Sequence, residues 1–471
     1  MEVSGGEIQV NGQTSMDALQ LTLGDAFVGV APGATLALAQ LENARVVDVE
    51  GSLHFRHTDP HDPCALSGNG EVRLAGGAIT GTAIVGCDAV ATLRGHGTIG
   101  APLANSGAIL ADTPGGWLVL GECDKRNELT GTLVAMDGAL LGIEGIRLEN
   151  LGLVDVTETS HLLLDAAVLD NVGAGHTDVL GTYELRNGAM VFGAFNAPAG
   201  SAGTLGAGGG VYGLGDATVG GTLDVLNRPA DGATDTLVRF DGGLAVEATG
   251  VVRAEGGTTL VLNGPLSVAS TERTEFDLAG ADVTIQSESI TADPYEMEIA
   301  GNDLGAVTAG WDDNFAVASL ALGGEAPGRI SLTDDADSHG DGLGNEALYV
   351  SELLLGVGAC IRLNDLPLYY RNGEDPKRLA YGDTDLDGDV DAVDLAGFGL
   401  AWAPDGSGNA WSEGDFDGDG DVDAVDLAAL GLAWAPAGTD GAGPAGTLPE
   451  PATLALVALG AAVVARRRHE R

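Results

Sequence analysis

Two stretches near the C-terminus place aspartates at the same spacing. The first, GDTDLDGDVDAVDL, begins at Gly382, and the second, GDFDGDGDVDAVDL, begins at Gly414, 32 residues later. Counting from the residue after that glycine, aspartates fill positions 1, 3, 5, 7, 9 and 12 of each copy. They are Asp383, Asp385, Asp387, Asp389, Asp391 and Asp394 in the first copy and Asp415, Asp417, Asp419, Asp421, Asp423 and Asp426 in the second. So many carboxylates in a short segment repel one another unless a cation lies among them.

The spacing is that of a calcium loop. Side chains at positions 1, 3, 5, 9 and 12, a backbone carbonyl at position 7 and a glycine at position 6 form the twelve-residue loop of EF-hand proteins. Gly388 and Gly420 occupy position 6, and no lysine or arginine lies between Arg378 and Arg466. The alternative, a disordered acidic linker, gives no reason to fill every ligand position twice. We therefore expect two calcium ions and a segment whose folding depends on them.

A helix is expected after each loop and none before the first. Position 8 is Val390 or Val422, as needed if the two loops pair side by side. Apolar residues then follow at helical spacing, i, i+3 and i+7, before a proline that ends the helix. They are Leu395, Phe398, Trp402 and Pro404 in the first copy and Leu427, Leu430, Trp434 and Pro436 in the second.

A loop and helix duplicated at this length resemble the type I dockerin family over residues 382–436. The resemblance implies an EF-hand module that binds calcium and docks onto a cohesin partner, often to tether polysaccharide-degrading enzymes. In that family loop positions 10 and 11 contact the partner, and here they are Ala392, Val393, Ala424 and Val425. Many members of polysaccharide-degrading complexes have hydroxylated residues there instead. Identical copies imply docking in two orientations related by a pseudo-twofold axis.

The C-terminal sequence, LPEPATLALVALGAAVVARRRHER, has the parts of a sorting signal. Residues 452–465 are uncharged and apolar. As a helix they span about 21 Å, less than the ~30 Å hydrocarbon core, and the arginines that follow favour the cytoplasmic side. Pro449, Glu450 and Pro451 with this transmembrane helix and basic end resemble the PEP-CTERM signal. The resemblance implies membrane anchoring before processing by an exosortase. A plain membrane anchor is the alternative.

The first 378 residues consist of short alternating runs separated by Gly, Asn and Asp. Gly accounts for 75 of 471 residues, and 44% of the chain is hydrophobic. Runs such as GATLALAQLENARVVDVEGSLHF indicate many short strands with tight turns. A parallel β-solenoid (β-helix) and a series of β-sandwiches both fit. We favour the solenoid because stacked coils tolerate irregular loops, and the coils resemble bacterial surface β-helix proteins, including autotransporter-like passengers.

Two further groups of residues are weaker metal-site candidates. One is a His/Cys cluster that suits zinc, although its prolines and aspartates also indicate a plain loop. It consists of His54, His57, His61 and Cys64. The other is an acidic loop, TDDADSHGDG, that suits calcium but matches no loop template. Its carboxylates are Asp334, Asp335, Asp337 and Asp341.

Charge and cysteine content limit the partners and the chemistry. The net charge of −48 disfavours nucleic acid and anionic lipid and favours cations. Four cysteines are too few for a disulfide scaffold, although export would permit one or two bridges. They are Cys64, Cys87, Cys123 and Cys360. No catalytic residues are identified, and Met1 to Gly12 have neither the basic start nor the apolar run of a signal peptide, so the expectation of export rests on the C-terminus.

The sequence therefore predicts a mainly β protein with a small all-α module. We expect a solenoid body over 1–378 with a closing segment at 314–370, the calcium module over 379–437, a linker at 438–448 and the sorting signal over 449–471. In the closing segment, Leu363, Leu366, Leu368 and Tyr370 are placed to cover the end of the solenoid. The predicted function is a non-catalytic exported or cell-surface protein that attaches to a cohesin-like protein or a surface polysaccharide. The alternative is a glycosidase or polysaccharide lyase of solenoid fold, recruited to a polysaccharide catabolic complex by its dockerin.

Overall fold

The chain divides into two compact units, Met1–Thr259 and Leu260–Arg471, in a computed structural model of the protein. The residues that the structure describes are 2–3, 7–21, 27–43, 45–56, 64–207, 211–214, 217–227, 236–240, 242–269, 276–287, 289, 292–312, 314–324, 326–336, 346–406 and 409–435.

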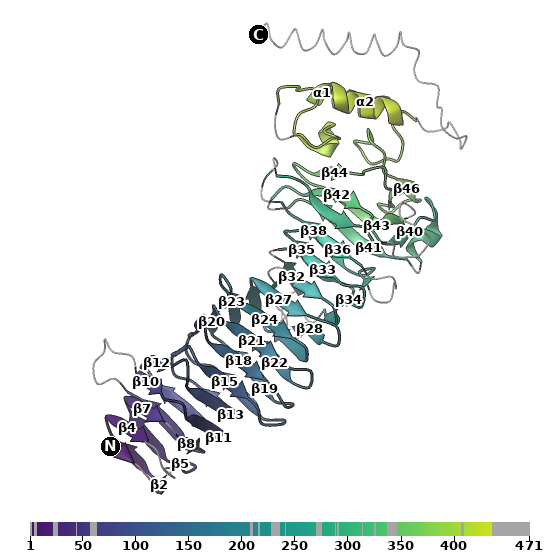
Figure 1. The fold of residues 1–471 in the computed structure, drawn as a ribbon. Helices are drawn as coiled ribbons and strands as arrows, with labels where there is room; N and C mark the ends of the chain where they lie inside the picture. Colours follow the sequence, from purple (N-terminus) through teal and green to yellow (C-terminus); the bar gives the residue numbers. More distant parts are fainter. Residues whose placement is uncertain are drawn as a thin grey trace. The chain divides into compact units, whose positions relative to one another are not determined.

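The first unit is a parallel β-solenoid whose strands stack on three faces (Figure 1). The first face consists of β1 (Glu2–Val3), β4 (Ala18–Leu21), β7 (Gln40–Asn43), β10 (Cys64–Ser67), β12 (Val85–Cys87), β14 (Leu103–Asn105), β17 (Lys125–Asn127), β20 (Arg147–Asn150), β23 (Val168–Asn171), β26 (Met190–Phe192), β29 (Val211–Leu214) and β32 (Thr236–Phe240). The second consists of β2 (Glu7–Val10), β5 (Phe27–Val30), β8 (Val46–Val49), β11 (Glu71–Gly81), β13 (Thr92–Ile99), β15 (Ala108–Ala111), β18 (Thr132–Ala135), β21 (Leu153–Val156), β24 (His176–Val179), β27 (Ala194–Ala197), β30 (Ala217–Val219) and β33 (Leu244–Val246). The third consists of β3 (Gln13–Ser15), β6 (Thr35–Leu38), β9 (Ser52–Phe55), the second halves of β11 and β13, β16 (Trp117–Leu120), β19 (Leu140–Glu144), β22 (His161–Asp165), β25 (Thr182–Arg186), β28 (Ala202–Ala207), β31 (Thr222–Val225) and β34 (Val251–Ala254).

The alternating sequence pattern explains this stacking. In β18, Leu133 and Ala135 are buried and alternate with the half-buried Thr132 and Val134, as the period of two requires. Between β18 and β19 the chain turns through Asp137 and Gly138, which have φ angles of 57° and 78°. Such left-handed turn positions favour Gly, Asn and Asp, which accounts for their frequency between the runs.

A buried ladder of asparagines joins four consecutive coils on the first face. Asn105 Nδ2 donates to Asn127 Oδ1 at 2.8 Å, Asn127 Nδ2 to Asn150 Oδ1 at 2.8 Å, and Asn150 Nδ2 to Asn171 Oδ1 at 2.7 Å. Paired strands on this face are 21–23 residues apart along the chain, so the ladder requires an asparagine at each such step. Because each amide both donates and accepts, the buried polar atoms satisfy one another.

One buried cation lies next to this ladder. Lys125 is 3% exposed, and its Nζ donates to the carbonyls of Ala101, Gly121 and Cys123 at 2.9–3.0 Å. Burial lowers the pKa of this lysine to about 8.

The cysteines form no disulfide: all four lie among the described residues and are free thiols, so the bridges that export would permit are absent from the structure.

The second unit begins with the same parallel stacking. One column consists of β36 (Leu266–Val268), β39 (Tyr295–Glu298), β42 (Arg329–Thr333) and β44 (Cys360–Arg362). Another consists of β38 (Asp282–Ile285), β41 (Ala316–Leu322), β43 (Glu346–Leu355) and β45 (Leu368–Tyr370). The remaining elements are β35 (Thr258–Leu262), which spans the boundary between the units, β37 (Phe276–Asp277), β40 (Gly301–Asn302), the 3-10 helix η2 (Thr308–Trp311) and β46 (Lys377–Arg378).

The predicted closing segment ends the parallel stacking in this unit. Leu363, Leu368 and Tyr370 are buried and Leu366 is half-buried. After β45 the chain reverses, and β46 pairs with it in the antiparallel direction. The chain then forms α1 (Ala392–Ala401), the 3-10 helix η3 (Trp411–Glu413) and α2 (Ala424–Ala433), which belong to the same compact unit.

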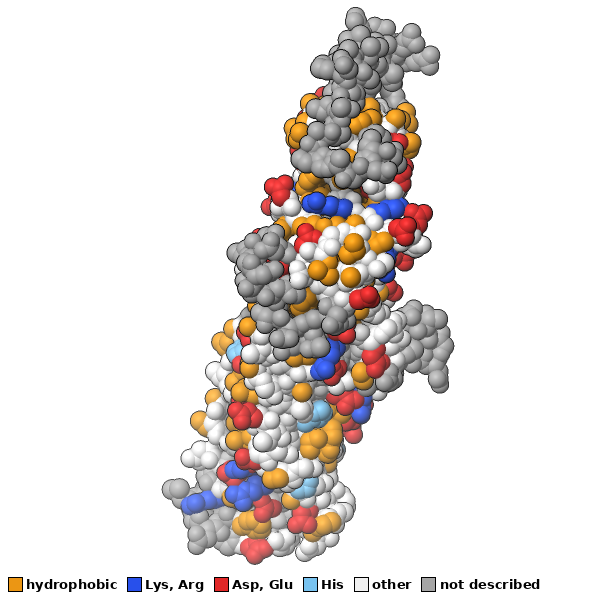
Figure 2. All heavy atoms as spheres, turned by 90° about the vertical axis from the view of Figure 1, so that its right-hand side faces the viewer, with side chains coloured by type: hydrophobic (Ala, Val, Ile, Leu, Met, Phe, Trp, Pro, Cys, Tyr) orange, Lys and Arg blue, Asp and Glu red, His pale blue; other side chains and the backbone are white. Residues whose placement is uncertain are grey.

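The prediction of a mainly β, parallel solenoid with a small helical module is confirmed. A series of antiparallel sandwiches is not what forms, since the pairings of both units are parallel except β40 with β43 and β45 with β46 among the described strands. Acidic side chains are spread over the visible face, with lysine and arginine side chains among them (Figure 2). The predicted apolar helix at 452–465 lies outside the described residues. Among the described helices, none is both long and apolar enough to cross a membrane.

We predict that the asparagine ladder stabilises its coils. Asn127→Ala removes the buried hydrogen bonds that join this residue to Asn105 and Asn150, and each such bond typically contributes about 0.5–1.5 kcal/mol. The denaturant midpoint of unfolding should therefore fall. Asn196→Ala is the control, because that half-buried side chain donates only to Asp178 Oδ1 on the outer face. Equal midpoints for the two variants would contradict the prediction.

Candidate metal centre

The first aspartate-rich loop gathers carboxylates around one buried side chain. Asp383, Asp385 and Asp394 each have a carboxylate oxygen within 4.8 Å of the other two. Asp383 is fully buried, and its Oδ2 accepts hydrogen bonds from Tyr370 Oη at 2.7 Å and from Gly388 N at 3.3 Å. Its Oδ1 is buried and has no hydrogen-bond partner among the described residues. A buried carboxylate oxygen in such a group suits a hard cation.

The residue at loop position 12 also fixes the start of α1. Asp394 Oδ1 accepts from Thr384 N at 2.7 Å, and its Oδ2 accepts from Asp391 N at 2.9 Å. Asp391 in turn accepts from Val393 N at 2.6 Å, which completes a capping box. The loop and the helix are thus one local structure, because the same two aspartates belong to both.

The second loop repeats this arrangement. Asp415 is fully buried, with Oδ1 accepting from Gly418 N at 2.8 Å and Oδ2 from Gly420 N at 3.1 Å. Asp426 accepts from Phe416 N at 2.7 Å and, through Oδ2, from Asp423 N at 2.9 Å, so it also forms a capping box at the start of α2.

Each loop brings together five of its six predicted aspartates, in two groups that share position 12. The groups are Asp383, Asp385 and Asp394; Asp389, Asp391 and Asp394; Asp415, Asp417 and Asp426; and Asp421, Asp423 and Asp426. Asp387 and Asp419, at position 5, belong to none of these groups. Their carboxylates accept from the backbone of Asp389 and Asp421 at 3.0 Å.

The two loops pair differently from the sequence-based expectation. Val390 and Val422 are buried, but the described bridges do not join them to each other. Val390 pairs with Ala435, after α2, and Val422 pairs with Ala403, after α1. Each loop therefore pairs with the residue that follows the other copy's helix. This reciprocal pairing relates the two copies by a pseudo-twofold axis.

The electrostatics of both loops disfavour buried negative charge without a cation. Burial, reinforced by repulsion from Asp394, raises the pKa of Asp383 to about 6, against the effect of the Tyr370 hydrogen bond. Burial, reinforced by repulsion from Asp426, raises the pKa of Asp415 to about 7. A divalent cation among these oxygens would offset both effects, because it stabilises the ionised carboxylates.

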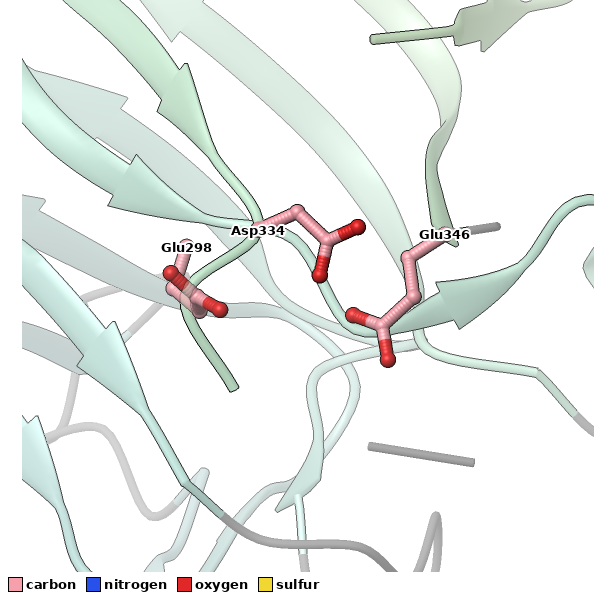
Figure 3. A group of neighbouring side chains, drawn as sticks. All are labelled: Glu298, Asp334 and Glu346. Carbon is pink, nitrogen blue, oxygen red and sulfur yellow. The ribbon is translucent and has the colours of Figure 1, made fainter. Parts of the chain in front are cut away.

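A third acidic group lies in the solenoid part of this unit. Glu298 at the end of β39, Asp334 after β42 and Glu346 at the start of β43 each have a carboxylate oxygen within 4.8 Å of the others (Figure 3). Glu298 is also bound by the backbone N–H groups of Asp335 and Ala336 at 2.8 Å. The sequence predicted calcium at Asp334 and Asp335 but neither glutamate, because both are distant in the chain. The other predicted ligands, Asp337 and Asp341, lie outside the described residues.

The proposed zinc cluster is described only in part. His54 Nδ1 lies 3.0 Å from Thr80 Oγ1, and the buried Cys64 thiol donates to the carbonyl of Arg56. Neither belongs to a group of metal-ligating side chains in the described part of the chain. His57 and His61 lie outside it.

The predicted partner contacts lie at the exposed starts of the two helices. Ala392 and Val393 begin α1, Ala424 and Val425 begin α2, and all are exposed. The predicted cleavage residues Pro449, Glu450 and Pro451 lie outside the described residues.

The residues that hold the loops against the solenoid are not among those predicted from the sequence. Trp411 is fully buried, and its Nε1 donates to the carbonyl of Asp383 at 2.8 Å. The signal was present, since Trp411 stands in NAWSEG, between the two copies and outside their repeat. Tyr370 was expected to cover the end of the solenoid, but its bond to Asp383 depends on packing that the sequence does not reveal.

Comparison with known proteins identifies the two C-terminal segments. No curated protein and no solved structure matches the chain. Residues 381–431 match the family model of the dockerin type I domain, and residues 447–468 match the PEP-CTERM protein-sorting motif. Both resemblances inferred from the sequence are confirmed. Dockerin domains bind calcium and a cohesin-type partner, and the PEP-CTERM motif implies processing by an exosortase. The chain is thus an exported, cell-surface protein that is sorted through its C-terminal tail.

Proposed function

We propose that this chain is a non-catalytic surface protein that attaches to a cohesin-type partner through a module loaded with two calcium ions. The observation that carries the proposal is the pair of buried loop aspartates, Asp383 and Asp415, each grouped with further carboxylates within a segment that matches the dockerin type I domain. Once the module is attached to its partner, the solenoid is the surface that the protein displays.

The ligands proposed for each ion follow from the loop positions. Side chains at positions 1, 3, 5, 9 and 12 and the backbone carbonyl at position 7 would hold each ion. Asp383 and Asp415 supply position 1, and their burial orders the loop around them. The capping boxes support the same assignment, because they fix positions 9 and 12 relative to each other.

We predict that the full chain binds two calcium ions and that each loop can be disabled separately. Asp385→Ala and Asp417→Ala remove position 3 from the first and second loop, so each variant should bind one ion in isothermal titration calorimetry. Asp405→Ala, an exposed change between the two loops, should still bind two. A wild-type stoichiometry of one or zero would refute the assignment of two sites.

The proposed docking surface is apolar and doubled. Val393 is 60% exposed and Val425 is 56% exposed, at equivalent positions of the two copies. Leu400 in α1 and Leu432 in α2, which also occupy equivalent positions of the two copies, are 77% and 88% exposed. Two such equivalent apolar patches support a partner that binds in either of two orientations, with the apolar contact supplying most of the affinity.

We predict that single substitutions on this surface are tolerated and the double substitution is not. Val393→Asp or Val425→Asp should weaken binding only about twofold to a cohesin module that binds the wild-type chain, because the other copy can still dock. The double variant should lose at least about 100-fold, since a charge would enter an apolar interface in either orientation. Val357→Asp, at an 88% exposed position on the solenoid, is the control. Affinity is measured as binding to a panel of immobilised cohesin modules. If the affinity of the double variant equals that of the wild-type chain, this surface is excluded as the docking site.

We predict cleavage of the tail near Pro449–Pro451 in the native host. The apolar run at 452–465 is too short to span a bilayer comfortably, and its arginine end fixes its orientation. Before processing, this run would anchor the chain in the membrane. Mass spectrometry of the mature protein should therefore recover no peptide ending in RRRHER. Intact tails on most of the envelope-associated protein would indicate a plain anchor instead.

One observation favours the enzymatic alternative. A groove of about 430 Å³ in the first unit is lined by Asp48, Glu50 and Asp112 together with Arg73, Arg94 and His96. Glycosidases use a pair of carboxyl groups that flank the scissile glycosidic bond. However, Asp112 is already paired with Arg94, and the groove lining contains no Trp, Tyr or Phe for sugar stacking. An activity screen on polysaccharides distinguishes a glycosidase or lyase from the attachment protein.

A further inference from the structure

The first calcium loop is bonded directly to the last parallel strand of the solenoid. Tyr370 ends β45 and is fully buried, and its hydroxyl donates to Asp383 Oδ2 at 2.7 Å. Asp383 is the residue at loop position 1. A single hydrogen bond thus joins a solenoid side chain to a proposed calcium ligand. A module connected to the solenoid only by a linker would lack such a contact.

The second loop is bonded to the neighbouring column of strands. The buried Arg329 of β42 donates through its guanidinium to the carbonyl of Gly418, and Arg362 Nε of β44 donates to the carbonyl of Asp417 at 3.2 Å. These carbonyls belong to loop positions 4 and 3. Two arginines of the solenoid therefore fix the loop backbone between the proposed ligands Asp417 and Asp419.

An aromatic cluster fills the space between the two loops and the coil. Trp411 donates from its backbone N to the carbonyl of Ala359, before β44, and from Nε1 to the carbonyl of Asp383, both at 2.8 Å. Its ring lies 5.6 Å from that of Tyr381 and 5.3 Å from that of Phe416, between ring centroids. Tyr381 Oη in turn accepts from Leu363 N at 2.9 Å. The coil and the module share one core.

The difference between the two copies of the repeat agrees with this contact. Loop position 4 is Leu386 in the first copy, with φ of 59°, and Gly418 in the second, with φ of 74°. A Cβ at Gly418 would overlap Cys360 Sγ of β44. The second loop thus requires glycine because it lies against the solenoid, whereas the first loop has the half-buried Leu386 in the same backbone conformation.

We propose that calcium binding and closure of the last solenoid coil form one cooperative unit, in which Tyr370, Arg329 and Arg362 are positioning residues for the calcium loops. The proposal rests on calcium binding by the module. Ions that stabilise the ordered loops also stabilise every contact that needs those loops ordered. Coupling is reciprocal, so a closed coil raises the calcium affinity and bound calcium protects the coil.

Hydrogen exchange on the full chain, with calcium and with excess chelator, tests the coupling. Chelation should speed the exchange of backbone amides in residues 383–435 and also in 346–370. Strands β18 and β21 of the first unit should not change. Faster exchange confined to 383–435 would overturn the proposal while leaving calcium binding intact. If calcium changes exchange nowhere and calorimetry detects no binding, the proposed function fails as well.

A matched pair of tyrosine variants tests the positioning role. Tyr370→Phe removes the hydroxyl that binds Asp383. Tyr369→Phe removes a hydroxyl from the same strand that donates to Asp303 Oδ1 at 2.9 Å, away from the loops. Tyr370→Phe should weaken calcium at one of the two sites about tenfold or more, as for hydrogen bonds to charged groups, and Tyr369→Phe should not. Equal affinities in the two variants would refute the positioning role.

A third variant separates docking from the loop chemistry. Gly418→Leu installs the residue that the first loop carries at the same position, and it should push the second loop away from β44. The amides of residues 359–363 should then exchange faster even with calcium present. Exchange there as slow as in the wild-type chain would show that the module does not close the coil.

Discussion

The stacking of parallel strands imposes the constraint on which the C-terminal structure depends. Each coil pairs its backbone with the coil before it and the coil after it, so the last coil has an edge that would bind other strands if left uncovered. In the second unit, β46 covers β45 by reversing direction, and the module covers β44. The carbonyl of Ala359 and the N–H of Leu363 find partners in Trp411 and Tyr381. Covering that edge places the acidic loops against a buried surface.

That placement explains why a cation would stabilise the loop carboxylates. Asp383 and Asp415 are fully buried beside other carboxylates, and burial raises the pKa of both. On the surface of the first unit, arginines compensate part of the negative charge. On the outer face of the first unit, acidic residues pair with arginines from neighbouring coils, such as Arg186 with Asp165 at 2.8 Å. Those pairs remain in contact with water, so their charges need no ion. The loops instead combine burial with a surplus of negative charge, as the smaller group of Glu298, Asp334 and Glu346 also does.

The sequence predicted what is local and repeated. Period-two runs predicted the strands, and the aspartate spacing predicted both loops and the helices that follow them. The parallel solenoid was favoured over sandwiches, but its three faces and the alignment of Asn105 with Asn127 depend on which coil stacks on which. The pairing of Val390 with Ala435, rather than with Val422, and the bond from Tyr370 to Asp383 likewise depend on tertiary packing. Glu298, Asp334 and Glu346 come from three strands or their ends, so no spacing in the sequence joins them.

The two copies of the repeat are identical where they face outward and different where they face the solenoid. Ala392–Val393 and Ala424–Val425 match and are exposed. By contrast, Thr384 corresponds to Phe416, which packs against Trp411 and Phe398, and Leu386 corresponds to Gly418, which lies against Cys360. The inner face needs a single orientation because the coil edge has no twofold symmetry. The outer face is free of that requirement, so a module that is fixed on its own chain would still present two equivalent surfaces to the proposed partner.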